Sequence, residues 1–409
     1  MERDDSSLKN LFQQEFARMV AVISRRFGLT HIEMAEDVVS ATFLQAAETW
    51  GLKGLPPNPT AWLYAVARQK VLEQLRRRKI FEGSVLPELQ ARADLEDDGL
   101  DFSEQAIRDS QLQMIFAVCT PEIASEAQIG LALRILCGFG IDEIAEAFFS
   151  NKETINKRLL RAKEKLRGAG VSLELPSERE IPGRLDNVLH VLYLLFNEGY
   201  YSRTQNQVLR MDFCLEAMRL ATLLTEYEKT DLPKVNALLA LMCFHASRFP
   251  ARLTDDDGSI LYDEQDEDLW DRALIHRGME YLERSATGEV LSAYHLEARI
   301  ASWHCVKEDT VEKWEDILRL YDLLLEVNPS PSVLLNRVYA LYKAKGRDAA
   351  LANAEQLRME TDQFYFVLLG ELYKEVDAEK ARCHFQRAQA LARTETERHR
   401  IQEKIDRLA

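Results

Sequence analysis

The sequence lacks the features on which secretion, membrane insertion and disulfide-stapled folds depend. Its six cysteines are scattered with no C-x-x-C pair, which argues against a zinc ribbon or a disulfide framework and suits a reducing cytoplasm. No unbroken apolar run approaches the roughly 20 residues of a membrane span. The first ten residues, MERDDSSLKN, are polar, and no apolar segment follows them. We therefore expect a cytoplasmic chain with no membrane partner, whose cysteines pack in the core.

Motifs of catalysis and metal binding are also missing. There is no glycine-rich phosphate loop, nucleophile elbow or H-E-x-x-H. Adjacent residues such as His304 and Cys305 point about 100° apart on a helix and cannot easily share a metal ion. DDDG at Asp255–Gly258 resembles a calcium loop, but Leu253 stands at its first ligand position. A turn fits better, which leaves open one short β-hairpin near residues 251–262. We expect no enzyme activity, no metal and no cofactor.

Strand signals are nearly absent. Apolar residues recur at spacings of three and four along most of the chain, as in LFQQEFARMVAVISRRF, and this periodicity predicts an all-α protein. Two stretches lose the pattern, because one gathers acidic residues and the other carries glycine and proline. They predict two linkers between three helical blocks, with the order 1–80, 81–105 (linker), 106–168, 169–184 (linker) and 185–409.

The third block contains a weak internal echo. The segment LYKAKGRDAALANA, which contains Tyr342, aligns with LYKEVDAEKARCHF, which contains Tyr373, at an offset of 31 residues. That offset is close to the roughly 34 residues of a tetratricopeptide unit. Small residues in both copies would let two antiparallel helices approach closely. We expect a stack of helical hairpins over at least residues 290–409.

One predicted helix of the chain is strongly basic. The chain has a formal net charge of −15, yet residues 152–167 carry seven Lys or Arg against two Glu. Because charges in salt are screened within roughly 8 Å, such a cluster usually serves a local partner, although a solvated helix face remains an alternative. Ser150 and Glu153 form a potential capping box, so we expect helices at 141–149 and 151–167 joined by a tight turn, as in a helix-turn-helix.

The basic helix has a predicted inner and outer side. Ile155, Leu159, Ala162 and Leu166 fall on one face and would hold the helix to its own domain. The basic residues then lie on the flanks and the far side, where they could meet phosphates and base edges.

A second basic segment lies in the first block. Asn58 is a predicted cap for a helix that starts at Pro59. Trp62 and Tyr64 precede a run of cations in this helix, and aromatic plus cationic side chains are typical of sites that capture unstacked bases. Two alternatives stay open, since Trp62 could be a core residue and the terminal arginines could be a solvated helix end.

Several segments in order resemble one family. AEDVVSATFLQAAETW followed by NPTAWLYAVARQKVLEQLRRRK resembles the polymerase-binding and −10 promoter-reading parts of extracytoplasmic-function sigma factors, and LALRILCGFGIDEIAEAFFSNKETINKRLLRAKEKLR resembles their −35-reading domain. VLYLLFNEGYY, DDDGSILYDEQDEDLWDRALI and YDLLLEVNPSPSVLLNRVYAL look like the C-terminal extension of one sigma subfamily with a tetratricopeptide-like tail. Where the family often has Asn and Asp in the −10 helix, this chain has Gln69 and Glu73.

The resemblance implies roles for particular residues. The residues implied in −35 recognition are Lys152, Thr154, Asn156, Lys157, Arg158 and Arg161. The residues implied in −10 recognition are Trp62, Tyr64, Arg68, Gln69, Lys70, Arg76 and Arg77. The residues implied in polymerase binding are Glu36, Asp37, Ser40, Phe43 and Gln45, although the acids also suit a helix N-terminus.

The acidic tail completes the functional hypothesis. We expect a sigma factor whose partners are core RNA polymerase and promoter DNA, both duplex and melted. Its tail would act through an intramolecular contact or a protein partner, with Asp257, Gly258, Asp263 and Asp266 as candidate regulatory residues. A solvated loop is an equal alternative for these acids. Two rival functions are a one-component regulator with a sensing tail, and an interaction scaffold with a degenerate DNA-binding half.

Overall fold

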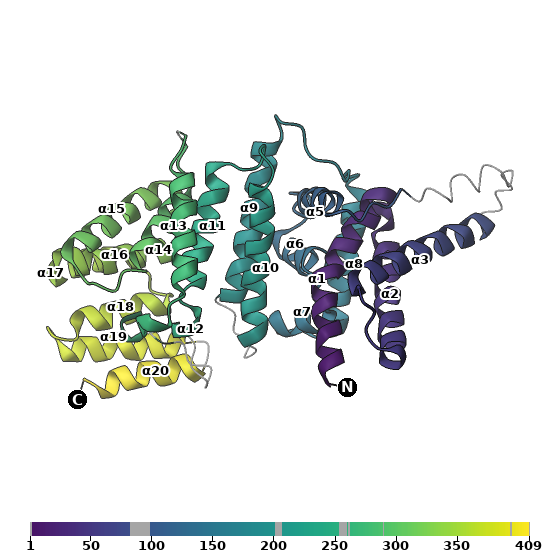
Figure 1. Ribbon diagram of the computed structural model, residues 1–409. Helices are drawn as coiled ribbons and strands as arrows, with labels where there is room; N and C mark the ends of the chain where they lie inside the picture. The colour runs from purple at the N-terminus through teal and green to yellow at the C-terminus, as the bar shows by residue number, and fades with distance from the viewer. Residues whose placement is uncertain are drawn as a thin grey trace. The chain divides into compact units, whose positions relative to one another are not determined.

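The computed structural model of the 409-residue chain is helical, and its described residues contain no strand (Figure 1). The structure describes residues 2–81, 99–200, 207–252, 260, 262–288, 290–392 and 395–408. The chain divides by packing into two compact units, Met1–Val235 and Asn236–Ala409. The prediction of an all-α fold is therefore confirmed.

The first unit is built around its first helix. Its elements are α1 (Glu2–Phe27), η1 (Leu29–His31), α2 (Ile32–Lys53), α3 (Pro59–Phe81), α5 (Glu104–Val118), α6 (Ser125–Leu131), the π-helical turn η2 (Ala132–Leu136), α7 (Ile141–Ala147), α8 (Lys152–Gly168), α9 (Ile181–Tyr200) and α10 (Gln207–Thr225). Helix α1 contacts α2, α5 and η2. Phe16, Met19 and Ile23 on α1 are wholly buried, so this helix supplies much of the core shared by these elements.

A local signal starts α3 where the sequence predicts. The Asn58 side chain accepts a hydrogen bond of 3.0 Å from the backbone N–H of Ala61, and α3 begins at Pro59. This arrangement satisfies one of the free N–H groups of the first turn, while proline has no N–H to satisfy. The cap predicted at Asn58 is confirmed.

Helices α9 and α10 belong to the first unit by their contacts. The Arg184 guanidinium donates to the Phe116 carbonyl at 2.8 Å, and Asn187 donates to the Cys119 carbonyl at 2.6 Å. Arg219 on α10 donates to the carbonyl of Leu136 at 2.9 Å. These bonds satisfy carbonyls at helix ends. The predicted boundary at 169–184 stays a prediction, while the packing boundary falls at Val235.

The second unit is a succession of helices in which neighbours in sequence pack together. It contains most of α11 (Pro233–Ala246), then α12 (Phe249–Arg252), η3 (Tyr262–Glu264), η4 (Glu267–Leu269), α13 (Arg272–Ser285), α14 (Ala293–Trp303), α15 (Val311–Val327), α16 (Pro331–Lys345), α17 (Arg347–Leu357), α18 (Gln363–Tyr373), α19 (Ala378–Leu391) and α20 (Glu395–Asp406). Each helix from α13 to α19 contacts the next along the chain. The expected helical stack is present.

Close helix crossings occur where the sequence places small residues. Ala350 on α17 and Ala381 on α19, which correspond in the internal echo, are both wholly buried. A Cβ atom on Gly370 would lie 2.5 Å from the Phe385 ring, so only glycine lets α18 and α19 pack this closely. The tetratricopeptide-like classification itself remains a prediction.

Three expectations need comment. Cys383 is exposed, unlike the other five cysteines, so the expectation of six core cysteines is wrong at this position. Most of the acidic linker, residues 82–98, lies outside the described residues. The possible hairpin near 251–262 falls largely on residues 253–259 and 261, which are also outside them, and its described flanks belong to α12 and η3.

Candidate nucleic-acid interface

Helix α8 starts one residue later than the sequence predicts. Its cap is Asn151, whose side chain accepts a hydrogen bond of 2.8 Å from the N–H of Thr154. The capping box expected from Ser150 is therefore wrong, because α7 ends at Ala147 and the turn continues to Asn151. Within that turn Phe149, which the sequence predicts at the end of the first helix, has φ 46° and is 67% exposed, so its ring is open to solvent close to the start of α8.

The apolar stripe of α8 is buried as predicted. Ile155, Leu159, Ala162 and Leu166 are 2%, 5%, 3% and 1% exposed. Helix α8 packs through them against α6 and α7. Burial of this stripe fixes which side of α8 faces solvent.

The outer side of α8 presents the candidate −35 residues to solvent. Lys152, Asn156, Lys157, Arg158 and Arg161 are exposed, and Thr154 is partly buried.

Three of these cations form ion pairs with exposed carboxylates of the same domain. Lys152 pairs with Asp142 at 2.6 Å, and Lys157 with Glu153 at 2.7 Å. Arg158 pairs with Glu126 at 2.7 Å. Arg161 has no ion-pair partner within the described ranges. Exposed pairs of this kind contribute little to stability, about 0 to 1 kcal/mol, so a phosphate could replace the carboxylates at small cost.

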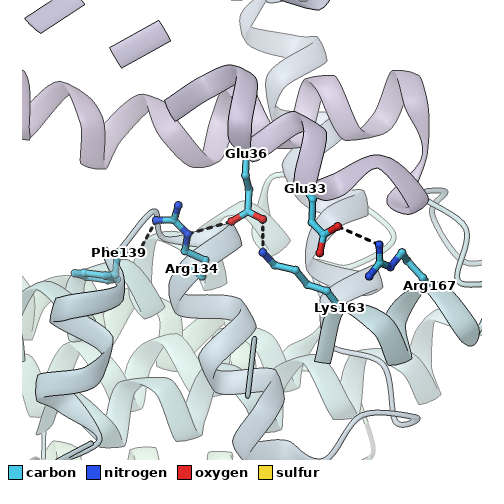
Figure 2. A network of polar contacts seen from close by, with 6 residues as sticks. All are labelled: Glu33, Glu36, Arg134, Phe139, Lys163 and Arg167. Carbon is cyan, nitrogen blue, oxygen red and sulfur yellow. Dashed lines mark hydrogen bonds and ion pairs between the residues drawn. The ribbon is translucent and has the colours of Figure 1, made fainter. Parts of the chain in front are cut away.

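The C-terminal half of α8 is engaged differently, because its cations meet carboxylates of α2 (Figure 2). Glu36 is 6% exposed and lies between two cations. It accepts from Arg134 Nε at 3.0 Å and from the Lys163 ammonium. Beside it, Arg167 donates to Glu33 at 3.1 Å. Three ion pairs thus join α2 to η2 and α8.

The surroundings of Arg134 explain how this charge cluster is tolerated in a buried position. Its Nη1 donates to the Phe139 carbonyl at 3.1 Å, and its guanidinium lies 4.5 Å from the centroid of the Phe16 ring. Each oxygen of Glu36 has a cationic donor. Since a buried charge is acceptable only when it is paired and hydrogen-bonded, this network meets the condition.

The candidate polymerase-binding residues on α2 separate into two groups. Glu36 and Phe43 are buried, and the Phe43 ring packs edge-on against Phe12 at 4.9 Å. Asp37 and Ser40 are exposed, and Gln45 is half-buried. Leu44, 63% exposed, lies on the same side as the exposed pair. The face of α2 open to a partner in this conformation is therefore the one with Asp37, Ser40 and Leu44.

Two candidate −10 residues are occupied by contacts within the chain. The Tyr64 hydroxyl donates to Glu15 at 2.5 Å, and its ring stacks on Phe102 at 4.6 Å. Burial, followed by the bond to Glu15, raises the pKa of Tyr64 above its ordinary range. Arg68 donates to the Leu100 carbonyl. The segment before α5 therefore covers this part of α3.

The remaining −10 candidates differ in their exposure. Trp62 is half-buried, and its ring meets that of the buried Trp50 edge-on at 5.3 Å. Gln69 is exposed and donates to Glu73 at 3.2 Å, while Lys70 is partly buried. The side chains of Arg76 and Arg77 lie outside the described residues, although α3 continues through them.

The candidate tail residues are described only in part. Asp257 and Gly258 lie outside the described residues, as does the side chain of Asp263. Asp266 caps η4, since its carboxylate accepts a hydrogen bond of 3.0 Å from the N–H of Asp268.

Sequence reasoning missed Arg134, Lys163 and Arg167 as members of a network. A signal existed for Arg134, because a single arginine within the apolar run LALRILCGFG must find a partner when the run is buried. No sequence signal points to Glu36 as that partner. Within the described ranges, no group of three His, Cys, Asp or Glu side chains is placed to hold a metal ion. No helix in this part of the chain is long and apolar enough to span a bilayer.

Comparisons with known proteins give two family matches and one relative. Residues 12–80 match the family described as sigma-70 region 2, and residues 184–286 match a family of unknown function, DUF6596. The chain is 32% identical over 387 residues to a protein of Rhizobium meliloti (strain 1021) named uncharacterized protein R00370, covering 93% of this chain and 91% of the relative. No solved structure matches the chain significantly.

Proposed function

We propose that this chain, which belongs to one family with the Rhizobium meliloti relative and matches sigma-70 region 2 at residues 12–80, is an extracytoplasmic-function sigma factor that directs core RNA polymerase to specific promoters. The observation that carries the proposal is the match of residues 12–80, which covers nearly all of α1 to α3, to sigma-70 region 2. Region 2 is a non-enzymatic transcription-factor domain, so the protein lends specificity to an enzyme and is not one itself. Its place of action is the cytoplasm, where polymerase works.

The two basic helices take different parts in this function. Helix α8, with its apolar stripe buried and its cations outward, inserts into the major groove at the −35 element. Helix α3 meets the −10 element. There Trp62, the exposed Gln69 and the partly buried Lys70 face the melted strand. The acidic remainder of the chain disfavours non-specific DNA binding, because it repels phosphates away from these two surfaces.

Promoter binding requires α2 and α8 to separate. The −10 and −35 elements lie about 25 base pairs apart, or about 85 Å at 3.4 Å per base pair. In the described conformation Arg167 on α8 and Glu33 on α2, the helix that precedes α3, are 3.1 Å apart, so α3 and α8 cannot reach the two elements at once. We infer that this conformation is a closed one, and that opening it breaks both the three ion pairs to α2 and the packing of α1 against α5 and η2.

Transcription from purified components tests the proposal. Core polymerase with this protein should start transcripts at defined promoters that polymerase alone ignores. A sigma factor binds its promoter tightly only within the polymerase complex. If the protein alone binds duplex DNA tightly and adds no polymerase-dependent start sites, the one-component regulator is the correct function.

The second unit is the regulatory part of this proposal. A chain ending at residue 232, before α11, should differ from the full chain in promoter-dependent transcription. Asp266→Asn removes one charge and keeps a capping side chain, so a change caused by this variant reports charge and not helix capping. Equal transcription by the shortened and full chains at every salt concentration would exclude regulation by this unit.

A further inference from the structure

The second unit contains a cavity of about 700 Å³. Helices and loops between residues 248 and 404 line it, and both aromatic and charged side chains face it. Cavities of roughly 300 to 1,000 Å³ are the size that encloses a small organic molecule. None of the lining residues belongs to the DNA-binding or polymerase-binding sets, so the proposed function leaves this cavity unused.

One wall of the cavity is a continuous series of aromatic rings. The ring centroids of Tyr262 and His304 are 5.2 Å apart, those of His304 and Trp314 5.9 Å, and those of Trp314 and Tyr339 5.5 Å. All three pairs meet edge to face. Such a wall offers ring faces and edges to a flat ligand.

Most cations around the cavity already have carboxylate partners. Lys343, whose ammonium lies 5.4 Å from the Trp314 ring, pairs with Asp309 at 2.5 Å. Arg347 pairs with Glu375 at 2.5 Å, and Lys404 pairs with Glu371. These groups hold the helices together, and their charges are compensated within the protein.

Lys374 and Arg248 also line the cavity and have no ion pair within the described residues, but Lys374 is exposed whereas Arg248 is buried. Its side chain lines the cavity and is 7% exposed, with its guanidinium 5.7 Å from the Tyr262 ring centroid. Its buried Nε has no hydrogen-bond partner, and no carboxylate in the described part of the chain pairs with it. A buried guanidinium N–H without an acceptor costs free energy, and an anion in the cavity would supply that acceptor.

His304 also lies close to the positive charge of Arg248. Burial, followed by the charges of Arg248 and Lys313, lowers the pKa of His304 to about 3. The ring is therefore neutral near pH 7, and its buried Nδ1 has no hydrogen-bond partner. The unpartnered Arg248 Nε and His304 Nδ1 thus lie beside one cavity, and so does the unpartnered Nε of Arg347, whose guanidinium is otherwise paired with Glu375.

We propose that this cavity binds a small organic anion, whose carboxylate or phosphate pairs with Arg248 and whose flat ring packs against the wall formed by Tyr262, Trp314 and Tyr339. The guanidinium fork suits both anions, because it can donate two parallel hydrogen bonds to either. The aromatic wall selects the ring-bearing member among anions of equal charge.

Calorimetric titration of the full chain with matched probes tests the site. Phenyl phosphate and benzoate carry both a ring and an anion, inorganic phosphate carries the anion alone, and benzyl alcohol carries the ring alone. We expect at least one of the first two to bind at millimolar concentration or below, and more tightly than either partial probe. The stronger of the two identifies the preferred anion.

Variants then assign the binding to this cavity. Arg248→Met should weaken binding of the preferred probe about tenfold or more, since a charged hydrogen-bonded contact is lost. Arg319→Met, which removes an exposed arginine of α15, is the matched control and should change affinity by less than about twofold. Tyr339→Leu should weaken the ring-bearing probe and leave inorganic phosphate unchanged.

Two results would overturn the proposal. One is that no ring-bearing anion binds the parent chain at millimolar concentration. The other is that Arg248→Met, shown to be folded by circular dichroism, binds the probe as tightly as the parent. Neither result bears on transcription by the first unit.

Discussion

Glu36 in the first unit and Arg248 in the second are both buried charges, 6% and 7% exposed, but their surroundings differ. Glu36 accepts hydrogen bonds from two cations, whereas Arg248 has no ion pair within the described residues. A compensated buried charge fixes the positions of the elements that supply its partners. An uncompensated one keeps its desolvation cost until something outside the protein provides a counter-charge. The first arrangement suits a closed conformation, and the second suits a binding site.

The largest expected effect follows from removing the compensated charge. Glu36→Gln leaves Arg134 and Lys163 partly buried without a counter-charge, and we expect the first unit to lose about 3 kcal/mol of unfolding free energy. Urea unfolding followed by circular dichroism measures this. Glu33→Gln is the control, because its side chain is 42% exposed and should cost less than about 1 kcal/mol.

A variant outside the implied polymerase-binding set tests the closed conformation. Lys163→Met breaks one of the pairs between α8 and Glu36, so α2 and α8 should separate more readily and the affinity for core polymerase should increase. Lys165→Met, at an exposed position on the same helix, should leave that affinity unchanged. In the urea-unfolding test above, an equal loss of unfolding free energy in Glu36→Gln and Glu33→Gln would mean that burial gives Glu36 no special role.

Acid should destabilise the second unit through His304. Its pKa is about 3 in the folded chain, below the 6.5 of the unfolded chain, so between these values the unfolded state binds more protons. Stability therefore falls as pH is lowered through this window, by about 2 kcal/mol between pH 6.5 and pH 5. His304→Phe, which keeps a ring in the aromatic series, should flatten the dependence in urea unfolding at several pH values. An unchanged slope would assign the acid sensitivity to other groups, such as His245.

Removing the uncompensated charge of Arg248 should not lower the free energy of unfolding, in contrast to removing the charge of Glu36. Arg248→Met relieves the desolvation of an unpaired guanidinium, so the free energy of unfolding should stay the same or rise by about 1 kcal/mol. Thermal unfolding of the full chain without added anions measures the change. A clear loss of stability would place Arg248 among the structural residues and remove the contrast with Glu36.

The smallest effect on stability is expected at the outer side of α8. Lys157→Glu with Arg161→Glu alters only exposed side chains, so unfolding should change by less than about 0.5 kcal/mol. Promoter binding by the polymerase complex should weaken, with the log–log salt slope reduced by about 0.9 for each lost phosphate contact. If a folded double variant binds promoters as the parent does, this side of α8 is a solvated surface.

Local features of this chain could be predicted because their causes are local. The buried stripe of α8 follows from spacings of three and four residues, and the start of α3 follows from Asn58 and Pro59. The start of α8 was predicted less well, because Ser150 and Asn151 are both good caps and only the length of the preceding turn chose between them. The helical stack of the second unit followed from periodicity, whereas its cavity did not.

The sequence by itself determined that the chain is helical, which face of α8 is buried, and which segments carry positive charge, since each depends on neighbours within a few turns. Only the tertiary structure decided which charges are paired. Arg134 and Lys163 lie 98 and 127 residues from Glu36 along the chain, and no pattern in the sequence joins them. Likewise Arg248 is set apart because folding encloses it beside aromatic rings, with no ion pair to a carboxylate of the described residues. Burial sets the free energy of a charge, and burial is a property of the packed chain.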